Sequence, residues 1–127
     1  SSTGYGTLGY GLPASFGAKL AAKERPVVCV TGDGGILFTI GELASAVEAK
    51  IGVAILLWNN ESYKTIRDYM VADQIAPVGV LEYSPDFLTI AKGFGCATDS
   101  ADTPAALTEA LKAAYKRDVP TMIEVMA

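Results

Sequence analysis

Apolar and polar positions along this chain of 127 residues follow two alternating patterns. Residues 26–31 and 52–58 form continuous runs rich in β-branched and aliphatic side chains, which is typical of strands buried on both faces of a parallel sheet. Two further runs, at 96–98 and 121–126, predict two more strands. Apolar residues at helical spacing predict the intervening helices, at 13–23, 39–50, 61–71, 85–92 and 103–117. The alternation predicts one α/β domain, with a doubly wound, mainly parallel sheet and helices on both faces.

Three of these helices begin with a capping signal. Thr39 and Glu42 have the S/T-x-x-E spacing of a capping box, in which each side chain bonds a backbone N–H of the other residue. Ser84 and Thr103 each precede a proline, and proline suits the first turn of a helix.

Polar turns follow the two long apolar runs. Gly32-Asp33-Gly34-Gly35 comes after the first run and Asn59-Asn60 after the second. Because the carboxyl ends of successive parallel strands meet at one edge of a sheet, we expect Asp33 and Asn60 to converge there. One carboxylate and one amide oxygen suit Mg²⁺ when a diphosphate supplies further ligands, and the two glycines let backbone N–H groups approach phosphate. The alternative is that these are ordinary turn residues that end strands.

The glycine-rich opening fits a second kind of site. Gly4 to Gly9 match the G-x-G-x-x-G pattern of dinucleotide-binding folds, so a non-catalytic NAD or nucleotide-binding module is an alternative function. That pattern requires a strand before it and a helix directly after it. Here no apolar run precedes the glycines, and Pro13 delays the helix. The pattern therefore favours a loop that folds over another ligand.

Composition excludes several classes of partner. The net charge is −4 and the ten basic residues are scattered, which argues against nucleic acid. No apolar run reaches the roughly 18 residues that a membrane span needs. The chain has no histidine, and Cys29 and Cys96 lie far apart, so we expect no zinc site, reduced thiols and a cytoplasmic location. Half the residues are hydrophobic, which predicts large interfaces, and the serine at position 1 suggests a piece of a longer protein.

Two linked motifs carry a family resemblance. Gly32-Asp33-Gly34, followed after 24 residues by Asn59-Asn60, resembles the thiamine-diphosphate signature. The segment from Gly6 to Ala14 resembles the G-x-L-G-x-x-L-P-A segment of acetolactate synthases and 2-oxo-acid decarboxylases. The resemblance covers the whole chain. It implies that residues 1–127 are the C-terminal diphosphate-binding domain of a longer enzyme that uses thiamine diphosphate and Mg²⁺.

The resemblance also implies roles for particular residues. Asp33 and Asn60 would bind Mg²⁺ through their side chains, and Ser62 through its backbone carbonyl. Gly34 and Gly35 would hold the diphosphate.

Three further residues would contact the rest of the cofactor. Leu8 would lie beneath it and force its two rings into a V shape, which makes the cofactor its own base. Gly6 would accept a hydrogen bond from the 4′-amino group, and Tyr63 would pack beside the diphosphate turn. Leu8 and Gly6 are therefore the predicted catalytic residues. Trp58 is expected in the core, close enough to report cofactor binding.

The activity implied is decarboxylation of a 2-oxo acid, with release of an aldehyde or ligation to a second carbonyl compound. The glutamate that activates the cofactor would lie in a pyrimidine-binding domain elsewhere in a homodimer or homotetramer, so we expect this chain alone to catalyse almost nothing. Residues 73–79 resemble decarboxylases of guanidino 2-oxo acids. A regulatory or assembly subunit is the remaining alternative.

Overall fold

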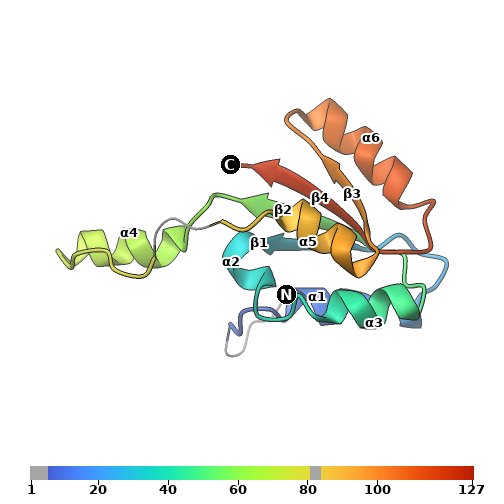
Figure 1. Ribbon diagram of the computed structural model, residues 1–127, viewed down its shortest axis with the longest axis horizontal. Coiled ribbons are helices and arrows are strands. Elements are labelled where there is room, and N and C mark those ends of the chain that lie inside the picture. The colour runs from blue at the N-terminus through green and yellow to red at the C-terminus, as the bar shows by residue number, and fades with distance from the viewer. Residues whose placement is uncertain (1–5, 81–83) are drawn as a thin grey trace.

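A computed structural model describes residues 6–80 and 84–127, and their strands form one parallel sheet. The strands lie in the order β1-β2-β4-β3 and pair in parallel throughout (Figure 1). Their bounds are β1 Val28–Gly32, β2 Ala54–Asn59, β3 Ala97–Ser100 and β4 Thr121–Met126. The predicted α/β class and parallel sheet are confirmed. All the carboxyl ends of these strands consequently lie along one edge.

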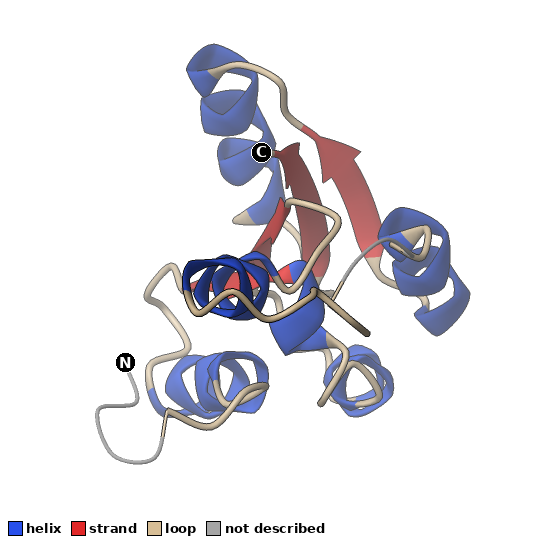
Figure 2. Cartoon of the chain, turned by 90° about the vertical axis from the view of Figure 1, so that its left-hand side faces the viewer, coloured by secondary structure: helices blue, strands red, loops and turns tan. Residues whose placement is uncertain are grey.

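Helices lie on both faces of the sheet, as Figure 2 shows from the end of the molecule. The helices of the described chain are α1 Gly11–Ala21, α2 Asp33–Ile36, α3 Glu42–Glu48, α4 Lys64–Ala72, α5 Phe87–Phe94 and α6 Pro104–Ala114, and α4 extends away from the sheet (Figure 1). α1, α3 and α5 pack on one face, and α6 packs against β3 and β4 on the other. Among the described residues no helix is long and apolar enough to cross a membrane.

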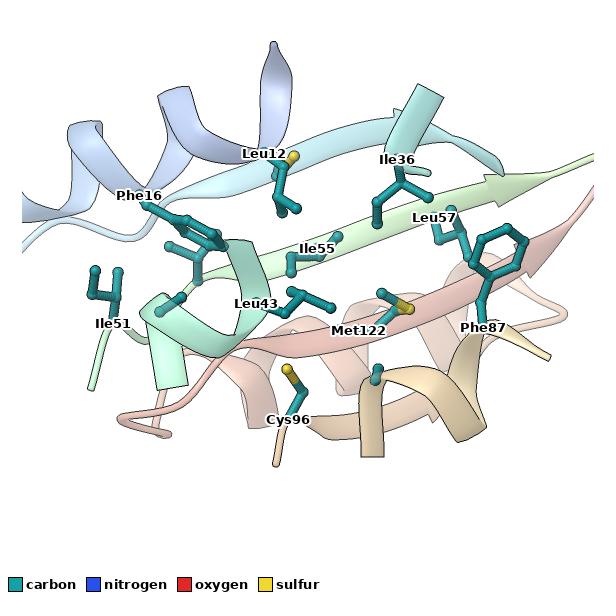
Figure 3. Close-up of a cluster of buried hydrophobic side chains, with 14 residues drawn as sticks. Leu12, Phe16, Ile36, Leu43, Ile51, Ile55, Leu57, Phe87, Cys96 and Met122 are labelled. Carbon is teal, nitrogen blue, oxygen red and sulfur yellow. The ribbon is translucent and has the colours of Figure 1, made fainter. Parts of the chain in front are cut away.

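The larger core lies under α1, α3 and α5 (Figure 3). Alternate residues of each strand point into it, namely Ile55 and Leu57 of β2 and Met122 of β4, all fully buried. The helices contribute large apolar side chains such as Leu12 and Phe87, each 1% exposed. This packing holds the helices against the sheet and fixes the strand ends from which the polar turns emerge.

Two expectations about burial are wrong. β1 was predicted to be buried on both faces, but Val28 and Val30 are 39% and 66% exposed. β1 lies at the edge of the described sheet, and α6 covers only the half of that face formed by β3 and β4. Trp58 is on the same uncovered half and is 51% exposed, so it is not a core residue.

Two of the three capping predictions need correction. The Thr39 hydroxyl donates to the Gly9 carbonyl at 2.8 Å instead of closing a capping box, and α3 begins after Gly41 with no side-chain cap. The cap of α5 is Asp86, whose carboxylate accepts from the backbone N–H of Thr89, and not Ser84. In the first case the hydroxyl is taken up as a donor by a distant carbonyl, and in the second a carboxylate two residues later is the acceptor. Thr103 caps α6 as predicted.

Candidate functional site

Asp33 and Asn60 converge at the carboxyl edge of the sheet. Asp33 directly follows β1, is only 8% exposed, and accepts from the Ser62 backbone N–H through Oδ2 at 3.2 Å. Asn60 directly follows β2 and accepts from the same N–H through Oδ1 at 3.2 Å. Because both oxygens face one amide hydrogen, they lie on the same side of the turn. The topology therefore brings together the two side chains that the sequence singled out.

The turn that carries Asn60 is fastened by its own side chains. Asn59 Oδ1 accepts from the Glu61 backbone N–H at 3.0 Å, and the Ser62 hydroxyl donates to the Asn60 carbonyl and to Asn60 Oδ1, both at 3.3 Å. Such side-chain bonds stabilise tight turns of asparagine residues. Glu61 has a left-handed backbone with φ 55°, which these bonds hold in place. The turn thus offers a defined set of oxygen atoms.

The donor atoms at this edge fit a hard divalent cation. Asp33 has a carboxylate and Asn60 an amide oxygen at this point, and Ser62 remains the predicted third ligand through its backbone carbonyl. Within residues 6–80 and 84–127 no three histidine, cysteine, aspartate or glutamate side chains gather into a metal cluster. An ion held by a single carboxylate must take other ligands from water and substrate phosphate, which is how proteins usually bind Mg²⁺. The residues present therefore fit Mg²⁺ together with a diphosphate.

Gly34 lies directly against an aromatic ring. A Cβ atom at this position would meet Cε1 of Tyr63 at 2.5 Å and Cδ1 at 2.9 Å. The Gly34 backbone N–H donates to Asp33 Oδ1 at 2.8 Å. The sequence suggested that glycine here admits a phosphate group. The structure adds that glycine also admits the Tyr63 ring, which lies beside the predicted metal ligand.

A cavity of about 210 Å³ opens between the strand ends and the start of α4. Its lining includes every predicted site residue except Gly6, that is Leu8, Asp33, Gly34, Gly35, Asn60, Ser62 and Tyr63. The structure brings these residues together, while their roles toward a ligand stay predictions.

The glycine loop before α1 packs beside this cavity and contributes to its lining. Gly6 and Gly9 both have positive φ, 62° and 83°. A Cβ at Gly9 would meet Phe38 Cβ and Thr39 Cγ2 at 2.9 Å, so the loop packs closely on the segment after α2. Leu8 projects from this loop into the cavity lining and is 48% exposed. Gly6 is exposed and lies outside the lining.

Sequence reasoning missed a second layer of polar residues behind the turn. Asn59 is 3% exposed and donates through Nδ2 to Glu124 Oε1 of β4 at 2.8 Å. Its Oδ1 also accepts from the Ser84 hydroxyl at 3.3 Å. A glutamate at an inward-facing position of an otherwise apolar strand was the signal that could have revealed this layer.

The basic residue at the cavity is already paired, and the two cysteines lie in the core away from it. Lys64 lines the cavity, but its ammonium lies 2.8 Å from Asp68 Oδ2, and this bond lowers the pKa of Asp68. Cys29 and Cys96 are buried in the core, and burial raises the pKa of both thiols. Neither thiol has the low pKa of a nucleophile.

The comparisons with known proteins agree with this geometry. Residues 1–125 match the family model described as thiamine pyrophosphate enzyme, C-terminal TPP binding domain. The chain belongs to this family. This thiamine pyrophosphate-binding domain is 46% identical over 124 residues to the probable 2-ketoarginine decarboxylase of Pseudomonas aeruginosa, covering 97% of this chain and 22% of that protein.

Two further proteins resemble the domain. It is 35% identical over 127 residues to the large subunit of acetolactate synthase isozyme 1 of Escherichia coli, covering 98% of this chain and 23% of the relative. The thiamine diphosphate-dependent 4-hydroxybenzoylformate decarboxylase of Rhodococcus jostii has a solved structure with a TM-score of 0.86 and 36% identity, covering 94% of this chain and 23% of that one. The domain spans less than a quarter of each. These findings support thiamine diphosphate as the cofactor and give no support to the NAD-binding alternative.

Proposed function

We propose that this domain binds the diphosphate end of thiamine diphosphate, with Mg²⁺, inside a longer enzyme that decarboxylates a 2-oxo acid. The observation that carries the proposal is the convergence of Asp33 and Asn60 on the Ser62 amide, beside the Gly34 turn. The enzyme releases an aldehyde or ligates the remaining fragment to a second carbonyl compound, as acetolactate synthases do.

The metal and diphosphate ligands come from the two strand ends. Asp33 and Asn60 bind Mg²⁺ through side-chain oxygens, and Ser62 binds it through its carbonyl. Gly34 and Gly35 hold the diphosphate, because no Cβ atom stands in the way; the Gly35 N–H donates to a diphosphate oxygen, while the Gly34 N–H already donates to Asp33. The burial of Asp33 favours this arrangement, since a buried carboxylate gains from a cation beside it.

The glycine loop would hold the ring end of the cofactor. Leu8 would support the bent conformation from within the cavity, and the Gly6 carbonyl would accept a hydrogen bond from the amino group of the pyrimidine. Tyr63 packs between the diphosphate turn and α4. When bound, thiamine diphosphate supplies a carbon nucleophile and an electron sink for the loss of CO₂. This domain's own part is to hold the cofactor in the orientation that the reaction needs.

Further parts of the enzyme complete the site. A glutamate of a pyrimidine-binding domain activates the cofactor, and the active unit is a homodimer or homotetramer. The exposed apolar residues Val30, Tyr69 and Val78 support extensive contacts outside this domain. Two free, buried cysteines support a cytoplasmic location. The similarity to a probable 2-ketoarginine decarboxylase makes a guanidino 2-oxo acid the first substrate to test.

Calorimetric titration of the complete enzyme with thiamine diphosphate, with and without Mg²⁺, tests the proposal. We expect saturable binding that requires the metal and is abolished by Asp33→Ala. Asp118→Ala, which removes an exposed carboxylate at the opposite end of the strands, is the matched control and should bind normally. Binding of NAD instead, or of no ligand, contradicts the proposal, and no ligand favours the regulatory alternative.

The substrate is tested separately. Product analysis with pyruvate and with 2-oxo acids bearing guanidino side chains distinguishes aldehyde release from ligation. Formation of neither product by an enzyme that binds the cofactor rules out the proposed reaction.

A further inference from the structure

Glu124 is a charged residue on the buried face of the sheet. Side chains alternate along a strand, so Glu124 shares a face of β4 with Met122, which is fully buried. On β2, Ile55, Leu57 and Asn59 occupy the same face, with Leu57 paired in register with Glu124. Each of these two strands therefore carries a polar residue on this face near the carboxyl edge of the sheet, Asn59 on β2 and Glu124 on β4.

The two polar residues are bonded to each other. Glu124 Oε1 accepts from Asn59 Nδ2 at 2.8 Å, while Asn59 Oδ1 accepts from the Glu61 N–H at 3.0 Å and from the Ser84 hydroxyl at 3.3 Å. If the amide were reversed, its NH₂ group would face two donors and its oxygen would face a carboxylate. The carboxylate of Glu124 and the Glu61 N–H therefore together fix which end of the amide faces the turn.

An ion pair does not explain the glutamate. The described part of the chain contains three ion pairs, and none of them includes Glu124. Glu124 is half-buried, and a carboxylate beside an apolar core is favoured there when it is hydrogen-bonded. In this structure its side-chain bond is the one to Asn59. The residue is thus placed to orient an amide.

The oriented amide controls the geometry of the turn. The bond from the Glu61 N–H to the Asn59 amide oxygen holds Glu61 at φ 55°, a backbone conformation that residues other than glycine rarely adopt. Glu61 lies between Asn60 and Ser62, and a change in its backbone moves both neighbours relative to Asp33. The orientation of Asn59 is therefore transmitted directly to the candidate metal ligands.

We infer that Glu124 is a positioning residue for the metal site, which acts through Asn59 to set the turn that carries Asn60 and Ser62. The inference rests on the proposed function, because it assumes that these residues bind the ion. It assigns to β4, which supplies no ligand itself, a part in metal affinity. Partners that orient metal ligands typically contribute about 10-fold to 100-fold in affinity.

Two substitutions separate orientation from charge. Glu124→Gln removes the charge but keeps an oxygen that accepts from Asn59, whereas Glu124→Leu removes both. The dissociation constant of Mn²⁺, used as the probe for Mg²⁺, is measured in the complete enzyme with saturating thiamine diphosphate by the loss of the free-ion electron paramagnetic resonance signal. Glu109→Leu removes an exposed carboxylate on α6 and is the control with the same change in net charge.

We expect Glu124→Leu to weaken Mn²⁺ binding about 10-fold or more, and Glu124→Gln to stay within about 2-fold of the wild type. Glu109→Leu should match the wild type. Thermal unfolding without metal and cofactor checks that each variant is folded. If the leucine variant does not fold, Glu124→Thr replaces it, since threonine suits a strand but is too short to reach Asn59.

The remaining outcomes overturn the inference in distinguishable ways. Equal weakening by leucine and glutamine would mean that charge alone matters, and unchanged affinity in a folded leucine variant would mean that Glu124 has no positioning role. Either result leaves the proposed function intact, because the wild type still binds the metal and cofactor. Absence of metal-dependent cofactor binding in the wild type removes the proposed function and this inference with it.

Discussion

Replacing Gly34 by alanine tests the contact between the glycine turn and Tyr63. The new Cβ atom would lie 2.5 Å from Cε1 of the ring, whereas ordinary van der Waals contacts begin near 3.4 Å. The ring must therefore retreat by about 1 Å or the turn must shift by as much. Tyr63 has limited freedom to retreat, because its backbone N–H donates to the Val80 carbonyl at 3.2 Å.

The magnitude follows from two opposing contributions. Overpacking of this kind costs about 1–3 kcal/mol. Replacing a helical glycine by alanine returns about 0.5–1 kcal/mol through the unfolded state. We therefore expect a net loss of about 1–2 kcal/mol in the free energy of unfolding, or a fall of about 3–8 °C in Tm for a domain of this size.

Urea and thermal unfolding of the 127-residue domain, without ligand, measure this effect. Gly17→Ala is the matched control, because Gly17 is also helical and nothing lies within 4 Å of its added Cβ, so this variant should be as stable as the wild type or more stable. Gly34→Ala is also made in a Tyr63→Ala background, where the clash is absent and the substitution should cost nothing. A loss of the same size in both backgrounds would refute the reasoning, since the ring would then not be the cause.

Three other predictions concern the rest of the fold. The hydrogen bonds from Thr89 lower the pKa of the Asp86 carboxyl. The stabilisation from this cap is therefore present above the ordinary carboxyl pKa and is lost as the pH falls through the lowered pKa. Asp86→Ala should be less stable than the wild type at neutral pH, and the unfolding curves of the two proteins should converge in acid. Burial raises the pKa of the Cys96 thiol to about 11, so iodoacetamide at mildly alkaline pH should modify this thiol only after the domain unfolds. The free energy of unfolding should also fall once the pH exceeds the ordinary thiol pKa, because only the unfolded chain then loses the thiol proton. Labelling of Cys96 in the folded domain would contradict this. Gly52→Ala would place its Cβ on the backbone carbonyl of Arg117, which cannot turn aside as a side chain can, and should cost at least about 3 kcal/mol by urea unfolding; near-native stability would show that these two segments can separate.

Elements set by local pattern could be predicted from the sequence. β4 occupies residues 121–126 as expected, because a mostly apolar run of this length marks a strand without reference to distant residues. The convergence of Asp33 and Asn60 was also predictable, since two parallel strands joined by a helix must end at the same edge.

Contacts between distant segments could not be predicted in this way. The Thr39 hydroxyl bonds a carbonyl 30 residues away, and Asn59 bonds Glu124 across 65 residues. In both cases the local sequence indicated a nearby role for the side chain, in a capping box for Thr39 and in a turn for Asn59. In the folded domain the side chain bonds a distant group that only the tertiary structure brings close. The exposure of Val30 and Trp58 likewise depends on how far α6 reaches across the sheet, which no local pattern encodes.

The position of β4 has a consequence for how this domain is made. β4 lies between β2 and β3, yet it comes after all the other strands along the sequence. While the ribosome is still synthesising the segment before residue 121, β1 and β2 can pair, but nothing yet joins them to β3. Until β4 is synthesised, one edge of β2 therefore has unpaired backbone N–H and C=O groups beside apolar side chains. A chaperone that covers this edge would protect the nascent polypeptide from aggregation until β4 can pair with β2.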